Sequence, residues 1–263
     1  MSTQEAENPV ARQPASNIAK VPFGRLVRVE LRKMYDTRAG MWLLIAIGVI
    51  TLAAVALFLF FAPEAELTFN NFVGVTATPQ AFLLPVLGIL VVTSEWSQRT
   101  GLISFTLEPV RGRILWAKVV AVILLGLVAV VLLLGFAALG NALGTSIQGG
   151  DGIWTFGAEG TRDVAILQLT GILSGLAFGM ILLNSAAAIV LSFVLPTAFG
   201  IFFGIVTSLA DAAPWIDLGT AQRPLFEHTM QGEDWAHLLV TGLWWVIIPL
   251  GVGAYRVLRS EVK

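Results

Sequence analysis

The sequence contains no cysteine, and charged side chains make up only 13% of its 263 residues. Without thiols the chain cannot form a disulfide-stapled secreted fold, a thiolate metal site or a cysteine nucleophile. Soluble domains carry roughly 25% charged residues, so this chain has too few to cover a water-exposed surface. Its 56% hydrophobic content excludes intrinsic disorder, and its net charge of -1 does not favour nucleic acid as a partner. We therefore predict an all-α integral membrane protein.

Long stretches without charge define the expected membrane spans. About 20 residues of helix cross the hydrocarbon core, and helices are expected because lipid cannot hydrogen-bond an open backbone. The longest stretch, between Asp163 and Asp211, holds 47 uncharged residues and therefore two spans joined by a tight turn at 184–185. The six predicted spans are 41–61, 72–93, 115–143, 164–183, 186–209 and 235–257, with an extracytoplasmic loop at 210–234.

Basic residues lie almost entirely on one side of these spans. Of the 16 Lys and Arg residues, 14 fall near the N-terminus, between spans two and three, or in the C-terminal tail. Only Arg162 and Arg223 fall on the other side. Because positive loops stay in the cytoplasm, we expect both termini to be cytoplasmic. The expected location is the cytoplasmic (plasma) membrane, which in bacteria is the inner membrane.

The N-terminal region divides into two parts before the transmembrane domain at 39–263. Residues 1–20 are polar and are expected to form a disordered cytoplasmic tail. Residues 21–38 are expected to form an interfacial amphipathic helix with basic residues outside its apolar face. This helix serves either as a membrane anchor or as a docking element, and the pattern favours neither. The residues of its apolar face are Phe23, Leu26, Val27, Leu31 and Met34.

We expect no charged side chain to be buried at membrane depth in these spans. Ion-coupled carriers and pumps need ionisable groups there, and intramembrane enzymes need paired acids, histidines or a metal. Neither class is favoured, so the chain is not expected to be an enzyme. His228 and His237 lie near acids in or beside the last outer loop. Because zinc prefers three or four convergent ligands, we expect no metal site there.

Small residues recur every four positions inside three of the spans. This spacing lets helix backbones approach closely, which favours association where no hydrophobic effect operates. Packing within one six-helix subunit is the favoured interpretation, and an interface between subunits is the alternative. The glycines concerned are Gly140/Gly144, Gly171/Gly175/Gly179 and Gly200/Gly204.

The segment between spans two and three, 94–114, is too apolar for a solvated loop. Leucine, isoleucine and phenylalanine are mixed with charged residues there, a composition typical of protein-docking surfaces. Glu95 and Arg99 are four residues apart and can pair on a helix that leaves the bilayer. Pro109 and Gly112 interrupt the chain before span three. We therefore expect a cytoplasmic coupling segment that contacts another protein.

Together these features resemble the permease subunit of the ATP-binding-cassette type-2 exporters. In that family an interfacial helix with a Glu-x-x-Lys core precedes span one, and Glu30-Leu-Arg-Lys33 matches it. An acid ending span two, a Thr/Gly pair, a proline with nearby arginines and a lysine entering span three then follow in order. The Thr/Gly pair is reversed relative to the usual Gly-Thr. The implied ATPase-coupling residues are Glu30, Lys33, Glu95, Arg99, Thr100, Gly101, Pro109, Arg111, Arg113 and Lys118.

The resemblance implies six spans in the type-2 exporter architecture and a function in export. None of the four lysines follows a glycine, so the chain lacks a phosphate-binding P-loop. No cofactor is therefore expected in this chain. ATP and Mg are implied to bind a separate ABC ATPase, in two copies, and a second permease, identical or related, completes the pathway. A non-transport membrane scaffold or sensor subunit of similar topology is the alternative.

In relatives, spans two and five face the partner permease across the pathway. Carried onto this chain, the pathway residues are apolar or neutral polar, which suits an amphipathic, drug-like or lipid-like substrate. Gln80 is the strongest candidate because an amide in hydrocarbon needs a partner. The alternative is that the hydroxyl groups only bond carbonyls of their own helix. The expected residues are Thr76, Gln80, Phe82, Thr93, Ser192, Pro196, Thr197 and Phe203.

Overall fold

The computed structural model describes residues 21–97 and 110–260, and every regular element within these ranges is helical. Six of the helices are long and apolar enough to cross a membrane, which confirms the helical class and the number of predicted spans. The predicted tail, 1–20, lies outside the described residues. So do four of the predicted coupling residues, Arg99, Thr100, Gly101 and Pro109.

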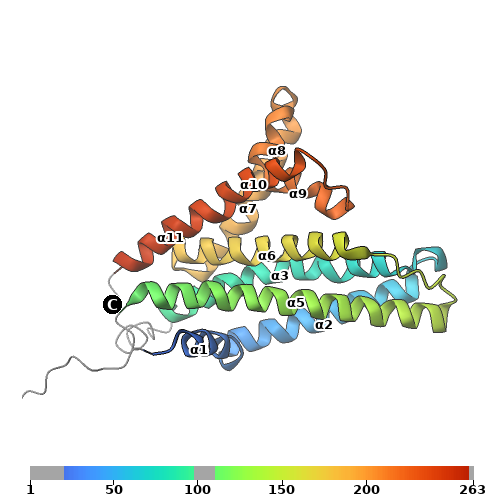
Figure 1. Ribbon diagram of the computed structural model, residues 1–263, viewed down its shortest axis with the longest axis horizontal. Helices are drawn as coiled ribbons and strands as arrows, with labels where there is room; N and C mark the ends of the chain where they lie inside the picture. Colours follow the sequence, from blue (N-terminus) through green and yellow to red (C-terminus); the bar gives the residue numbers. More distant parts are fainter. Residues whose placement is uncertain (1–20, 98–109, 261–263) are drawn as a thin grey trace, which may run out of the picture.

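The chain runs back and forth through these long helices. Figure 1 shows α2, α3, α5 and α6 side by side, with α1 and the end of α11 at one end of the molecule. We call this the α1 end, and the opposite end, which holds the turns at 62–68 and 149–156, the far end. The elements are α1 (Phe23–Asp36), α2 (Arg38–Phe61), α3 (Phe69–Ser97), α5 (Arg111–Gln148), α6 (Gly157–Leu182), α7 (Ser185–Ile205), α10 (Asp234–Gly242) and α11 (Ile248–Arg259).

A sharp corner separates α1 from α2. Thr37 is extended, and its hydroxyl accepts a hydrogen bond from the Gly40 amide at 3.2 Å, which caps α2. A Cβ atom on Gly40 would lie 1.9 Å from the Met34 carbonyl oxygen, so only glycine fits the corner. Val27 and Met34 of the predicted apolar face are buried. The corner therefore presses the apolar face of α1 onto the long helices.

Glycines bring α3 and α6 into backbone contact. A Cβ on Gly175 would lie 2.0 Å from the Pro85 carbonyl oxygen, and one on Gly88 would lie 2.2 Å from that of Ile172. Gly140 on α5 is similarly close to the Phe72 ring, at 2.5 Å. The expectation of packing within the subunit is confirmed for spans three and four. It is wrong for span five, because nothing lies within 4 Å of a Cβ placed on Gly200 or Gly204.

The predicted turn at 184–185 is present between α6 and α7. Leu183 ends α6 in the left-handed conformation at φ 53°, and the Asn184 side chain accepts from the Ala187 amide at 3.0 Å. Asparagine is a favoured helix N-cap because its side-chain oxygen replaces a missing backbone acceptor. Two spans therefore do occupy the 47-residue stretch.

The predicted outer loop, 210–234, is largely helical. It contains part of the 3₁₀ helix η2 (Thr207–Ala212), then α8 (Ala213–Ile216) and α9 (Leu218–Glu227). The last span is interrupted by a π-helical turn, η3 (Leu243–Ile247), just before Pro249, which has no amide hydrogen to donate to the helix. The Trp245 indole on this turn donates to the Ile216 carbonyl at 2.7 Å, which holds the turn against α8.

Candidate functional site at the α1 end

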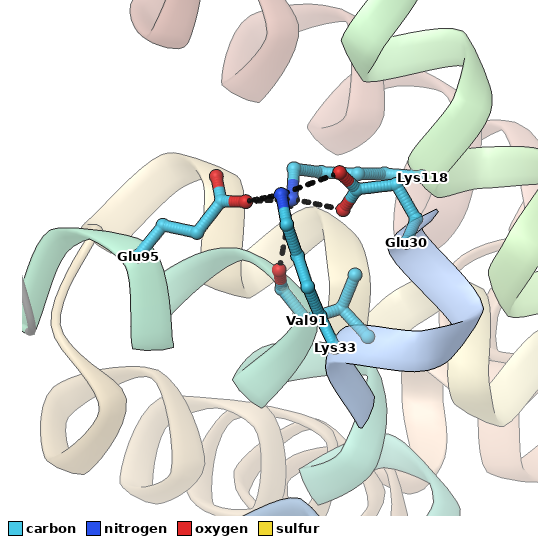
Figure 2. Close-up of polar contacts among 5 residues, drawn as sticks. All are labelled: Glu30, Lys33, Val91, Glu95 and Lys118. Carbon is cyan, nitrogen blue, oxygen red and sulfur yellow. Dashed lines mark hydrogen bonds and ion pairs between the residues drawn. The ribbon is translucent and has the colours of Figure 1, made fainter. Parts of the chain in front are cut away.

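Four of the predicted coupling residues meet in one cluster, contributed by three helices. Lys118 on α5 donates to Oε2 of Glu30 on α1 at 2.5 Å and lies 2.8 Å from Oε1 of Glu95 on α3. Lys33, also on α1, reaches Oε1 of Glu30 at 2.7 Å and Oε1 of Glu95 at 2.6 Å. Figure 2 shows the two carboxylates approaching the paired amines from opposite sides. We call Glu30, Lys33, Glu95 and Lys118 the charge cluster.

Three members of the charge cluster are almost completely shielded from solvent. Glu30 and Glu95 are each 4% exposed and Lys118 is 2% exposed, whereas the Lys33 side chain is 35% exposed. The expectation that the spans bury no charge is therefore wrong, since Lys118 lies inside the predicted span 115–143. Burial is possible because two lysines offset two glutamates, so each charge has an opposite partner.

The length of α5 explains how a lysine is accommodated within a predicted span. The helix has 38 residues and is therefore about 57 Å long. This exceeds the ~30 Å hydrocarbon core of a bilayer, so its ends extend beyond that core. Lys118 lies near the start of the helix and also donates to the Val91 carbonyl at 3.2 Å. Its charge is shielded by neighbouring helices rather than by lipid.

The pattern of α1 already places one acid among its apolar residues. Val27, Glu30 and Met34 are spaced three and four residues apart, and all three are buried on the same face. Lys33 follows Glu30 by three residues, which allows the two side chains to meet within the helix. The sequence could therefore reveal this pair, but it could not reveal that Glu95 and Lys118 complete it.

The two predicted arginines at the start of α5 bind backbone carbonyls of other elements. Arg111 donates to the Ser260 carbonyl at 3.0 Å, just beyond α11, and Arg113 donates to the Val21 carbonyl at 2.6 Å, just before α1. On α11, Arg256 donates to the Ile181 carbonyl at the end of α6. At Ser260 and Ile181 a cation is favoured because carbonyls at helix C-termini lack partners and carry partial negative charge. The first turn of α5 is thereby bonded to α1 and to α11.

The predicted pathway residues do not share one exposed surface. Thr76, Gln80 and Thr93 on α3 are buried inside the subunit. Phe82 is 59% exposed and lies near Phe193 of α7, with ring centroids 6.1 Å apart. On α7, Thr197 is exposed, Ser192 and Pro196 are half-buried, and Phe203 is buried beside Phe199 and Phe202.

The hydroxyl groups among these residues bond within their own helices. Thr76 donates to the Phe72 carbonyl, Thr93 to that of Ile89 and Thr197 to that of Phe193, each four residues earlier. Ser192 donates to the Ile189 carbonyl, three residues earlier. Thr93 also accepts from the Ser185 hydroxyl on α7 at 2.8 Å. The alternative interpretation therefore holds for Thr76, Ser192 and Thr197 but not for Thr93.

Among the described residues, three buried amides have carbonyl oxygens without a hydrogen-bond partner: Gln80, Asn141 and Gln168. Gln80, the strongest predicted candidate, is 2% exposed and its Oε1 has no partner. Gln168 on α6 is equally buried, donates to the Ala77 carbonyl at 3.3 Å and also leaves its Oε1 without a partner. The sequence analysis missed Gln168, although the signal that singled out Gln80, an amide in an apolar span, is present there too.

A second buried charge lies at the far end, on α6. Asp163 is 0% exposed; its Oδ2 lies 3.2 Å from Nδ1 of His228, and its Oδ1 accepts from Arg162 at 2.9 Å. His228 thus pairs with an acid 65 positions away, and not with the acids beside it in the sequence. His237 lies 3.9 Å from Glu233. Within residues 21–97 and 110–260, no group of three such side chains is arranged to hold a metal ion.

Comparison of the sequence with known proteins does not assign this chain to a family. No protein-family model matches the chain, and no curated protein matches it either. Any assignment of function therefore depends on the motifs of the sequence and on the geometry of the charge cluster.

Proposed function

We propose that this chain is the permease subunit of an ATP-binding-cassette type-2 exporter. It forms half of the membrane pathway, and a second permease, identical or related, forms the other half. Two copies of a separate ATPase bind ATP and Mg and drive transport. The carrying observation is the charge cluster, in which three separated motifs of the resemblance come into contact: the Glu30/Lys33 pair, the acid ending α3 and the lysine entering α5.

In this proposal the charge cluster links α1 rigidly to α3 and α5, and it is not itself the docking surface. Glu30, Glu95 and Lys118 are too deeply buried to touch a separate subunit. They hold α1 against α3 and α5, so a force applied to α1 reaches the spans. Removing one partner of a buried ion pair costs about 3–5 kcal/mol, so separating α1 from α3 and α5 is strongly unfavourable.

The docking surface is then the exposed face of α1 together with the coupling segment, 94–114. Arg25, Arg28 and Arg32 are all exposed on α1. An ATPase surface with acidic residues would complement them. This assignment makes the α1 end cytoplasmic and the far end extracytoplasmic, in agreement with the distribution of basic residues. The proposed cargo is an amphipathic, drug-like or lipid-like molecule.

The proposal is tested by co-expressing the chain with a cassette ATPase encoded beside it. The purified complex is reconstituted into liposomes, and ATP hydrolysis and substrate export are measured together. We expect the ATPase to co-purify, and the double variant Arg28→Ala/Arg32→Ala to weaken this association. Arg223→Ala, an exposed arginine of the far end, is the matched control and leaves association unchanged.

A cluster variant separates coupling from assembly. Lys33 is the most accessible member of the charge cluster, so Lys33→Ala is the substitution within the cluster that disrupts folding least. We expect the variant complex to assemble and hydrolyse ATP while exporting less substrate per ATP. A chain that binds no ATPase and supports no transport would instead favour the scaffold or sensor alternative.

A further inference from the structure

A cavity of about 490 Å³ opens at the far end of the molecule, between α2, α3, α6 and α9. It is separate from the charge cluster, and none of the eight predicted pathway residues lines it. None of the described residues that line it is a lysine or an arginine. Those used in the argument below are Phe58, Glu66, Thr78, Phe226 and His228.

A fixed carboxylate lies in the wall of this cavity. The Asn71 side chain donates to Oε2 of Glu66 at 2.8 Å and to the Glu66 backbone carbonyl at 2.8 Å, which holds the carboxylate in place. A carboxylate accepts up to about four hydrogen bonds, so it keeps capacity for a further donor. The segments predicted to be extracytoplasmic carry ten acids against two arginines, an excess that favours the approach of a cation from this side.

Aromatic rings provide an apolar wall beside this charge. Phe58 is held edge-on by Phe72, with ring centroids 5.1 Å apart. Phe226 is 60% exposed, a high value for a phenylalanine that lines a cavity. The His228 ring is oriented by Asp163 and by an edge-on contact with Phe156 at 5.3 Å. Aromatic faces attract cations through the negative potential above the ring.

Two acceptors without partners follow lining residues in the sequence but do not themselves line the cavity. Gln80 comes three positions after Ala77 on α3, and Gln168 comes four positions after Val164 on α6. Both Oε1 atoms are buried without a hydrogen-bond partner. Glu66 is the acceptor in the wall itself, so the wall is complementary to a ligand that carries positive charge or hydrogen-bond donors.

We propose that this cavity binds an amphipathic organic cation. The positive group lies against Glu66, and the apolar part lies against Phe58 and Phe226. Binding by itself requires no ATPase. The role of the site in export rests on the proposed function: it would hold the cargo on the extracytoplasmic side before release and would narrow the cargo class from amphipathic molecules to amphipathic cations.

The test compares two hydrophobic ions of the same shape and opposite charge. Tetraphenylphosphonium and tetraphenylborate are titrated into the full chain in lipid nanodiscs, and binding to empty nanodiscs is subtracted. We expect saturable phosphonium binding that is about tenfold or more tighter than borate binding, because a single well-placed charge is worth roughly 1–2 kcal/mol. Glu66→Gln keeps an acceptor for Asn71 and should weaken phosphonium binding about fivefold.

Matched variants locate the site. Glu64→Gln removes an exposed acid two residues away that does not line the cavity, and should leave the affinity unchanged. Thr78→Trp narrows the cavity from α3 and should weaken saturable binding without altering the charge. Equal binding of the two ions, or equal effects of Glu66→Gln and Glu64→Gln, would overturn the proposal. A failure to assemble with an ATPase would overturn the proposed function while leaving this binding result intact.

Discussion

Lys118 and Glu30 are 88 positions apart in the sequence, yet Nζ of Lys118 lies 2.5 Å from Oε2 of Glu30. Both side chains are buried, and Glu95 lies on the other side of the amine at 2.8 Å. A buried ion pair adds little net stability, because desolvation offsets most of the attraction. We infer that its effect is on specificity, because moving α1 away from this position would leave buried charges without partners.

Replacing Lys118 should therefore be much more damaging than replacing a surface lysine or arginine. Lys118→Met leaves two buried carboxylates with only Lys33 between them, and we expect a loss of about 3–5 kcal/mol in unfolding free energy. Thermal unfolding in detergent measures the loss. Arg32→Met breaks the exposed pair with Asp36 and should cost at most about 1 kcal/mol.

Reversing the cluster charges provides a second test of the same contact. Lys118→Glu should strongly lower the unfolding temperature, and adding Glu95→Lys should recover part of that loss. The double variant restores this pair with opposite sign but leaves like charges beside Glu30 and Lys33. Unfolding temperatures of the two single variants and the double variant form the cycle. Additive losses would show that the two side chains do not interact.

The contact between α3 and α6 predicts opposite effects for two glycines. Gly175→Ala would place a Cβ 2.0 Å from the Pro85 carbonyl oxygen, so we expect a loss of about 1–3 kcal/mol from overpacking. Gly200→Ala meets nothing within 4 Å and should be neutral or stabilising by up to about 1 kcal/mol, because alanine favours helix. Thermal unfolding under identical conditions compares them. Equal effects would contradict the close backbone contact.

The Asp163–His228 pair should hold α9 onto α6. In Asp163→Asn the histidine loses its carboxylate partner, and we expect faster amide hydrogen exchange over residues 218–228, equivalent to about 1–3 kcal/mol of local stability. Glu227→Gln changes an exposed acid next to the same histidine and should leave exchange unchanged. Unaltered exchange in both variants would show that α9 is held by apolar contacts alone.

The absence of cysteine allows a direct test of topology. Single cysteines at positions 65, 155 and 229, all exposed at the far end, should react in intact cells with a reagent that cannot cross membranes. A cysteine at position 28 on α1 should react only after the cells are opened. Labelling at position 28 in intact cells would contradict the cytoplasmic placement of α1.

Several features of the site could be predicted from the sequence because they depend on local spacing. The Glu30/Lys33 pair and the buried face of α1 follow from helical periodicity, and the cap at Asn184 follows from its position between two apolar stretches. Gln168 could have been found by the argument that selected Gln80. The helices within 210–234 were missed because this polar segment lacks a long periodic pattern.

The sequence by itself determined the class of this protein and its six spans, because a bilayer demands about 20 continuous apolar residues that satisfy their own backbone hydrogen bonds. Those requirements act within each segment. Only the tertiary structure decided that Lys118 is buried between Glu30 and Glu95, that His228 pairs with Asp163, and that glycines of α6 pack on α3 while those of α7 do not. Such pairings depend on where helices distant in sequence come together, which the spacing of residues within each helix does not specify.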